Sequence, residues 1–416
     1  MKMETEICVL TLNCWGIKGI SLDRVDRMTA IAESLADGKY DFVFLQEIWT
    51  TEDYEKIKAK TQAVLPYSHY FHSGVIGAGI CILSKAPIKS AFFHQWAVNG
   101  YVHKVYHGDW FGGKGIGLAQ VVYRGLNINL YTTHLHAEYD RVNDEYAAHR
   151  VTQAFDTAQF IALTSQNSDL VIVGGDLNTE PGDLAYRVII YSAQMRDSFF
   201  ELEKPANGPE NMGYTNDTPA NSYTSQKCLV SNPFGKRIDY VTYKPGKFVK
   251  VQTLNCETPW PSRVPGKQFS YSDHEAVVVR LKVSKSSIEE SPSSQKMQRK
   301  EALEEAVTVC SQALTNLKTS KNMYFGFGMI ALLVLLALSS FEAAGLFSYL
   351  KIAAQFVFVT VFVFSFFMGT IWNRMEVHGI LAGKLGMNLE LENDAKEAED
   401  GSGDNWTEVH PADCNK

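Results

Sequence analysis

The sequence predicts a layered α/β domain over residues 1–283, followed by a C-terminal hairpin of two transmembrane helices. Two observations predict this arrangement. Up to Val283, short runs of β-branched and aromatic residues alternate with stretches of helical periodicity, as in layered α/β folds. Beyond that point, a polar segment leads into two long apolar stretches. Because 416 residues exceed what one ordinary core accommodates, these shifts in composition mark the division of the chain.

The domain is expected to contain both strands and helices in mixed order. We expect strands over residues 7–12, 42–46, 79–84, 117–123, 126–135, 170–174, 238–243 and 276–283, and helices over residues 22–36, 51–64 and 144–165. Many strand pairs must be antiparallel, because only a turn separates several neighbours, as Arg124 and Gly125 do. This spacing disfavours a purely parallel, doubly wound sheet.

Five segments are expected after the domain. They are a linker over residues 284–300, a juxtamembrane helix over 301–321, transmembrane helices over 323–341 and 352–372, and an acidic tail over 373–416. Roughly 20 apolar residues in a helix cross a hydrocarbon layer of about 30 Å, and both stretches suffice. The apolar stripe of the juxtamembrane helix could lie on the bilayer or on the domain. The tail is expected to be solvated and disordered.

Charge and cysteine content indicate the compartment. Basic residues flank the hairpin on its outer sides, whereas its turn carries the single Lys351, so both termini and the α/β domain are expected in the cytosol. The glycosylation sequons at residues 216–218 and 405–407 would then stay unmodified. Seven cysteines without a pairing pattern fit a reducing compartment, and we expect no secretory signal peptide.

Six short polar segments, far apart in the sequence, lie next to predicted strand ends. Their reactive side chains are those of Asn13, Glu47, His134, His136, Asp176, Asn178, Asp239, Asp273 and His274. Each has an ordinary interpretation by itself, as a solvated strand-end carboxylate, a turn residue or a buried core histidine. As a set, their order, spacing and immediate neighbours match one family pattern.

The six segments together resemble the exonuclease–endonuclease–phosphatase superfamily, whose members fold like DNase I. The resemblance implies two packed sheets in a four-layer α/β sandwich. Four segments, LNCWG at residues 12–16, HGDWF at 107–111, THLHAEY at 133–139 and SDHEA at 272–276, are also similar to the neutral sphingomyelinases. The similarity extends to their smaller type, which ends in two membrane spans.

This resemblance implies a metal site and a general base. Mg²⁺ is a hard ion that is held by one or two carboxylates and retains several waters, so Glu47 with the Asn13 amide is a suitable ligand pair. Carried over from the family, Glu47 is the metal ligand and His274 activates water. Asp239 accepts the other N–H of His274 and thereby fixes its tautomer.

The remaining candidates would surround the phosphoryl group. By the same resemblance, His134 and Asn178 contact it, and Asp176 orients the nucleophile or assists proton transfer. Asp273 either binds metal or positions its loop. Lys114 follows glycines that let the backbone approach an anion, so it could contact phosphate, or it could be a solvated lysine in a flexible turn. His136 shares a strand face with His134, and a structural role is favoured for it.

The function implied is Mg²⁺-dependent hydrolysis of sphingomyelin, or a related choline phospholipid, to ceramide and phosphocholine. The expected location is an intracellular membrane, that of the endoplasmic reticulum. A lysophospholipase C that acts on lyso-platelet-activating factor remains an alternative. A nuclease needs a basic face, whereas this domain is nearly neutral, so no nucleic acid is expected as a partner. An inositol-polyphosphate phosphatase would carry a Trp-x-Asp-Arg-Ile type of segment, from which residues 237–240 depart. A non-catalytic scaffold is disfavoured because all six segments keep their reactive residues.

Overall fold

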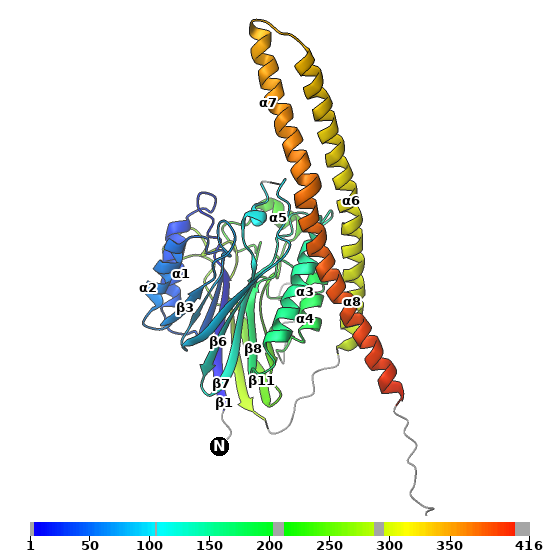
Figure 1. Cartoon of the computed structure of the whole chain (residues 1–416). Coiled ribbons are helices and arrows are strands. Elements are labelled where there is room, and N and C mark those ends of the chain that lie inside the picture. Colours follow the sequence, from blue (N-terminus) through cyan, green and yellow to red (C-terminus); the bar gives the residue numbers. More distant parts are fainter. Residues whose placement is uncertain (1–3, 105, 203–211, 287–294, 404–416) are drawn as a thin grey trace, which may run out of the picture.

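Two six-stranded sheets pack face to face, with helices on both outer faces (Figure 1). The computed structural model describes residues 4–104, 106–202, 212–286 and 295–403, so residues 287–294 of the predicted linker lie outside the described residues. The two sheets and their flanking helices confirm the predicted four-layer α/β sandwich.

The first sheet joins the two ends of the domain. Its strand order is β11 (Val249–Glu257), β12 (Val277–Lys285), β1 (Glu4–Asn13), β2 (Phe42–Gln46), β4 (Cys81–Ser84) and β3 (Tyr67–Tyr70). β1 and β2 are parallel, and the other neighbours are antiparallel. Helices α1 (Arg24–Leu35) and α2 (Thr51–Thr61) cover its outer face.

The second sheet has the same mixed character. Its order is β5 (Ile88–Gln95), β6 (Gly115–Tyr123), β7 (Leu126–His134), β8 (Leu170–Asp176), β10 (Asp239–Pro245) and β9 (Arg196–Asp197). β7 and β8 are parallel. Helices α3 (Ala147–Thr164) and α4 (Leu184–Ser192) cover its outer face, and two short helices, η1 (Gly108–Phe111) and α5 (Gln226–Ser231), lie in loops.

Strand β2 is continuously apolar up to Leu45 because both of its faces are buried. Side chains alternate between the faces of a strand, so Phe42 and Phe44 enter the layer between the sheets while Val43 and Leu45 pack beneath α1 and α2. The sheets approach closely at this point. A Cβ added to Gly174 on the facing strand would lie 2.2 Å from Cδ2 of Phe44, so glycine is required there.

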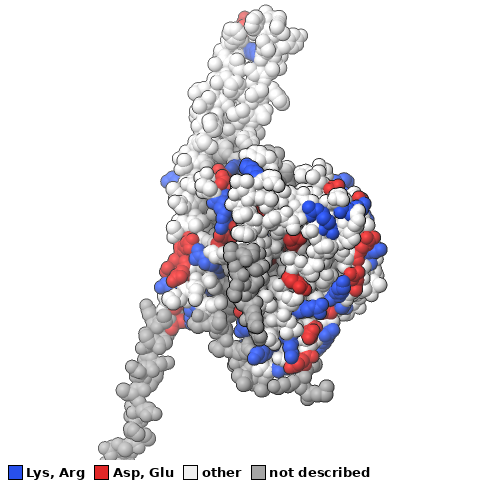
Figure 2. Space-filling model, turned by 180° about the vertical axis from the view of Figure 1, so that it is seen from behind, with Lys and Arg blue, Asp and Glu red and all other residues white. Residues whose placement is uncertain are grey.

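The C-terminal region consists of long helices. Helix α6 (Lys296–Ser340) joins the predicted juxtamembrane helix and first span without a break, and α7 (Leu346–Phe367) returns beside it. Both are long and apolar enough to cross a membrane, judged by length and composition. The hairpin projects from the domain, and its visible face carries few charged side chains, whereas the domain shows both signs of charge (Figures 1 and 2).

The base of the hairpin packs on the catalytic domain. Leu303 and Cys310 of α6 are fully buried in the core formed by α3 and α4, so the apolar stripe faces the domain. A π-helical turn (Met368–Trp372) leads into α8 (Asn373–Gly403), which packs on α3 and α6.

The prediction of disorder, which concerned the acidic stretch 390–413, is therefore wrong for residues 390–403, because they continue α8. Most side chains at 391–397 are exposed, and residues 404–416 lie outside the described part of the chain. The physical reason for this helix is a row of small residues on α8, formed by Gly379, Gly383 and Gly386. A Cβ on Gly383 would lie 2.8 Å from Thr152 of α3 and one on Gly386 would lie 2.7 Å from Phe155, so these two glycines let α8 approach α3 closely, while Gly379 lies against Val98 in the segment after β5. Ile380 and Met387 then fill the adjacent core.

Candidate active site

The topology brings the six polar segments to one edge of the sandwich. Asn13 is the last residue of β1, and the parallel pairing of β1 with β2 places Glu47 beside it. His134 is the last residue of β7, and the parallel pairing of β7 with β8 places Asp176 beside it. Asp239 begins β10 directly opposite Asp176 in an antiparallel register. His274 precedes β12, which is antiparallel to β1, and so reaches the same edge.

Backbone strain is concentrated at this edge. Trp15, Glu47 and Asn178 have φ angles of 46°, 55° and 46°, in the left-handed region that non-glycine residues rarely occupy. Each such residue costs on the order of 1–3 kcal/mol, and the cost is tolerated where surrounding contacts enforce the conformation. The sharp turns direct the side chains of Glu47 and Asn178 into the pocket.

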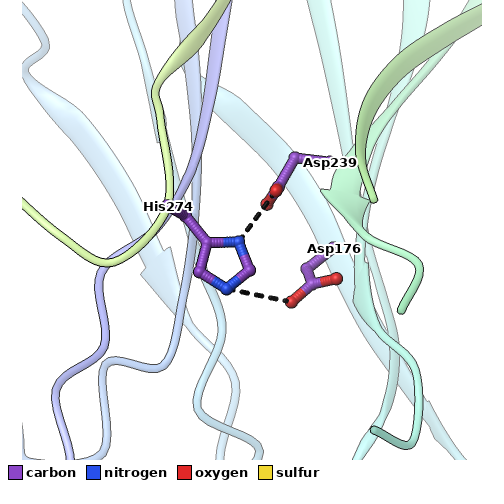
Figure 3. Close-up of side chains that lie close together, drawn as sticks. All are labelled: Asp176, Asp239 and His274. Atoms are coloured by element: carbon purple, nitrogen blue, oxygen red, sulfur yellow. Dashed lines mark hydrogen bonds and ion pairs between the residues drawn. The ribbon is translucent and has the colours of Figure 1, made fainter. Parts of the chain in front are cut away.

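His274 and Asp239 form the central pair. Nδ1 of His274 lies 2.8 Å from Oδ2 of Asp239, while its Nε2 lies 4.0 Å from Oδ2 of Asp176 (Figure 3). Burial opposes a charge on this imidazole, but the carboxylates of Asp239, Asp273 and Asp176 outweigh it and raise the pKa of His274 well above its usual value. With Nδ1 donating to Asp239, Nε2 is the atom that exchanges a proton with a reactant.

Asn13 links the two other carboxylates of the site. Its amide nitrogen donates to Oε1 of Glu47 at 3.1 Å and to Oδ2 of Asp176 at 2.9 Å. The second oxygen of Glu47 is buried without a hydrogen-bond partner. Burial, followed by the charge of Asp273, raises the pKa of Glu47. A buried carboxylate oxygen of this kind requires a cation or a proton.

These oxygen donors fit Mg²⁺. The unpartnered oxygen of Glu47 is a ligand of the type that this hard ion prefers. The amide oxygen of Asn13 is of the same type, but it accepts from the backbone N–H of Trp15 at 3.0 Å and the amide nitrogen faces Glu47, so Asn13 supports Glu47 by a hydrogen bond in this structure. Asp176, Asp239 and His274 also lie within 4.8 Å of one another and could hold an ion on spacing alone. We favour the position at Glu47, because Asp239 is already engaged by His274 and Mg²⁺ prefers oxygen to nitrogen.

Lys114 is buried, which contradicts the interpretation as a solvated lysine. Only 2 % of its side chain is exposed; it forms an ion pair with Asp109 and donates to the carbonyl oxygen of Leu135 at 3.1 Å. Its Nζ lies 3.2 Å from Nε2 of His134, and all three side chains reach the pocket. Burial and the charge of Lys114 lower the pKa of His134 well below its usual value, so this imidazole is neutral.

The other candidates have defined positions. Asn178 lines the pocket and donates its side-chain amide to the Leu135 carbonyl at 3.0 Å. Asp273 lies 4.0 Å from Nε2 of His274. His136 is buried and stacks on Tyr146 with ring centroids 4.0 Å apart, in agreement with a structural role.

Asp109 is the residue that the sequence interpretation missed as part of the site. Its only signal was a place within the HGDWF segment, five positions before Lys114. One pocket of about 740 Å³ is lined by Glu47, Asp109, Lys114, His134, Asp176, Asn178 and His274. Asn13, Asp239 and Asp273 do not line it and contact the site from behind these residues.

Comparison with known proteins agrees with this geometry. Residues 10–274 match the model of the endonuclease/exonuclease/phosphatase family. The putative neutral sphingomyelinase of Drosophila melanogaster is 40% identical over 93% of this chain and 97% of its own length. Sphingomyelin phosphodiesterase 2 of Rattus norvegicus is 40% identical over 81% and 80%. Inositol phosphosphingolipids phospholipase C of Schizosaccharomyces pombe is 32% identical over 67% and 69%.

Among solved structures, sphingomyelinase C from Streptomyces griseocarneus superposes with a TM-score of 0.51. It is 20% identical, and the match covers 66% of this chain and 99% of that structure. At this identity the likeness concerns the fold, and it supports the two-sheet architecture. The chain therefore belongs to the endonuclease/exonuclease/phosphatase family and, within it, to the neutral sphingomyelinases.

Proposed function

We propose that the protein is a Mg²⁺-dependent phosphodiesterase that hydrolyses sphingomyelin to ceramide and phosphocholine at a membrane surface. One observation carries the proposal. The His274–Asp239 pair, oriented by a 2.8 Å contact, lies in the same pocket as a buried Glu47 oxygen that lacks a partner. A general base and a cation site in one pocket are what phosphodiester hydrolysis requires.

The family relationship supports the substrate class. The relatives that match the chain over most of its length are named for sphingomyelin hydrolysis. The apolar hairpin supports a lipid substrate as well, because it would keep the pocket at the surface where lipids lie.

His274 would act as the general base. Asp239 holds Nδ1, so Nε2 faces Asp176, and in the neutral imidazole Nε2 would take the proton of a water at that position. Asp176 would orient that water through the oxygen that also accepts from Asn13. Because the carboxylates raise the pKa of His274, its protonated form is stable once the proton has been taken.

The phosphoryl group would lie between His134, Asn178 and Lys114, which offer neutral and charged donors along one wall of the pocket. Asp273 would position the loop that carries His274. Glu47 and Asn13 would hold Mg²⁺, which neutralises phosphoryl charge when it is bound.

The proposed setting is an intracellular membrane, that of the endoplasmic reticulum, with the domain and both termini in the cytosol. Basic residues on the outer sides of the hairpin support this orientation. Free cysteines, of which Cys8, Cys14, Cys81 and Cys310 are buried, are compatible with a reducing compartment.

Phosphocholine release from mixed micelles of detergent with sphingomyelin or lyso-platelet-activating factor tests the proposal. The full chain, Glu47→Gln and His274→Asn are compared with and without Mg²⁺, and the exposed Glu257→Gln serves as a matched control. We expect turnover of sphingomyelin that requires the metal and falls at least about 10²-fold in both site variants. Turnover of lyso-platelet-activating factor alone would change the substrate, and turnover of neither lipid would overturn the proposal.

A further inference from the structure

The wall of the pocket changes in character from one sheet to the other. Loops of the first sheet contribute aliphatic side chains, among them Ile17, Ile20 and Ile76. Loops that precede and follow β6, β7 and β8 of the second sheet contribute aromatic and acidic ones, Tyr106, Phe111, Glu138, Tyr139 and Glu180. A substrate with an apolar part and a polar head group would therefore meet two different surfaces on either side of the catalytic residues.

The aromatic rings of the second wall are open to a ligand. Tyr106 is 80% exposed and Tyr139 is 44% exposed although both line the pocket. Tyr139 is held rigidly, because its ring stacks on His107 at 3.8 Å and its hydroxyl donates to Asp109 at 2.9 Å. Exposed, fixed aromatic rings at a pocket wall are suited to contact a cation.

The same wall carries an excess of negative charge. Glu138 and Glu180 line the pocket and lie 2.9 and 3.6 Å from Arg141, which stands behind them and is paired with Asp183 at 2.8 Å. Three carboxylates thus share one guanidinium, so the charge of the two pocket carboxylates is only partly balanced. Asp183 accepts hydrogen bonds from both terminal nitrogens of Arg141, so this carboxylate is the main partner of the guanidinium. Lys236, which also lines the pocket, lies 3.4 Å from its own partner Asp217.

We propose that Tyr106, Tyr139, Glu138 and Glu180 form a subsite for a quaternary ammonium, the trimethylammonium group of a phosphocholine head group. Such a group has no N–H to donate and is recognised by aromatic faces and by diffuse negative charge. A neutral polyhydroxylated head group, such as inositol, would gain nothing from this charge and would need hydrogen-bond partners instead. The proposal rests on the proposed phosphodiesterase function and adds to it the residues that would select the head group.

Substrate competition within one ceramide series tests the subsite. The full chain in mixed micelles is given sphingomyelin or ceramide phosphoinositol, and kcat/KM is measured for the wild type, Tyr106→Leu and the double variant Glu138→Gln/Glu180→Gln. Tyr67→Leu and Glu257→Gln, both exposed and outside the pocket, are the matched controls. We expect each subsite variant to lower kcat/KM for sphingomyelin by about tenfold while the value for ceramide phosphoinositol changes less than about twofold.

Inhibition by small anions gives a second readout that does not depend on a second substrate being turned over. Free phosphocholine and inorganic phosphate share the phosphoryl contacts and differ in the ammonium group. We expect phosphocholine to inhibit the wild type more strongly than phosphate does, and the two inhibition constants to converge in the subsite variants but not in the controls. The exposed Tyr106→Leu keeps the test valid even if the double variant folds poorly.

The outcomes are distinguishable. Equal inhibition by the two anions in the wild type, or an equal loss for both lipids in the variants, would overturn the subsite while leaving sphingomyelin hydrolysis intact. A wild type that cleaves neither lipid would instead overturn the proposed function on which the subsite rests.

Discussion

Asp239 and His274 come from different sheets, since β10 belongs to the second and His274 leads into β12 of the first. Their 2.8 Å contact therefore depends on correct packing of the sheets, and the proposed general base would be complete only in the folded sandwich. The same holds for Asn13, whose amide reaches Asp176 across the sheets at 2.9 Å. The site residues therefore reach their mutual positions only when the two sheets pack correctly.

Replacing Asp239 with asparagine should separate orientation from packing. The amide retains the shape but can donate to Nδ1, which favours the wrong tautomer of His274, so we expect kcat to fall by about 10²–10⁴-fold. The measurement is kcat on sphingomyelin together with the thermal unfolding midpoint, with the exposed Asp140→Asn as the control. Activity within about twofold of wild type would show that Asp239 does not orient the base.

Glu47 should reveal the metal site without any assay of activity. Its unpartnered buried oxygen destabilises the metal-free fold, so Glu47→Gln should raise the thermal midpoint in the presence of a chelator. Mg²⁺ should stabilise the wild type by about 2.7 kcal/mol at 100 times its dissociation constant and should leave the variant nearly unchanged. An equal Mg²⁺ response in both proteins would place the ion elsewhere, for example at the cluster of Asp176, Asp239 and His274.

At the residue scale, the sequence predicted those site residues whose position follows from a strand end. Glu47 and Asp176 follow buried apolar strands, and the shared edge of the sheets brings them together. The burial of Lys114 was not predictable in this way, because it depends on the loop at residues 107–113 folding back so that Asp109 can pair with it. Loop conformation has no periodic signal in the sequence.

Helix α6 serves two environments along its length. Its first half contributes Leu303 and Cys310 to the core of the domain, and its second half is the first apolar span. We expect Leu303→Ala, at a fully buried site, to lower the free energy of unfolding by about 2–4 kcal/mol. Chemical denaturation in detergent measures this, and Leu163→Ala, at a leucine that is 70% exposed, is the matched control with an effect within about 0.5 kcal/mol. Equal effects would mean that the stripe does not pack on the domain in solution.

Asp156 should make the packing of α3 dependent on pH. It lies one turn after Thr152, whose hydroxyl is 3.9 Å from Sγ of Cys310, so it is on the side of α3 that faces α6. Burial raises the pKa of Asp156 to about 6. The folded protein therefore holds this proton more tightly than the unfolded chain, and stability is lost as the pH rises from about 4 to 6.

Asp156→Asn should remove that loss. We expect the variant to be more stable than the wild type by about 1–2 kcal/mol at pH 8 and equally stable near pH 4, measured as unfolding free energy across the pH range. A constant difference at every pH would show that the effect is steric. The exposed Glu257, replaced by glutamine, provides the control.

The elements that the sequence predicted are those with a clear period. β2 was placed residue for residue, and the other predicted strands and helices correspond to observed ones. Strands β3, β5, β9 and β11 and helices α4 and α5 were missed. β3 and β5 mix exposed and buried residues without a clear period, and β9 and α5 are very short. The sequence did carry a signal for the other two, since β11 alternates buried and exposed residues and α4 is largely apolar. Helix α8 was missed because its acidic composition indicated a solvated tail. Its glycines indicate close packing only once the surface of α3 that faces them is known.

In the whole molecule, the candidate phosphodiester site and the apolar hairpin have defined positions relative to each other. β1 runs from the marked N-terminus toward the end of the domain from which the hairpin projects (Figure 1). β1 ends at Asn13, so the candidate site residues beside it lie toward that end. Because α6 and α8 are packed on α3, the hairpin is attached rigidly to the domain. An anchor of this kind would hold the pocket near one leaflet and raise the effective concentration of lipid.

Glycosylation mapping of the full chain in microsomes should test the orientation. If both termini are cytosolic, the natural sequons at residues 216–218 and 405–407 stay unmodified. An acceptor site carried on an extended insertion in the turn between Phe341 and Gly345 should then be modified, because that turn alone would reach the lumen. Modification of the natural sequons, with an unmodified turn, would invert the topology and place the catalytic pocket on the lumenal leaflet. Modification at none of the three positions would mean that the hairpin does not cross the bilayer, and the pocket would then have to reach its lipid from a surface-bound state.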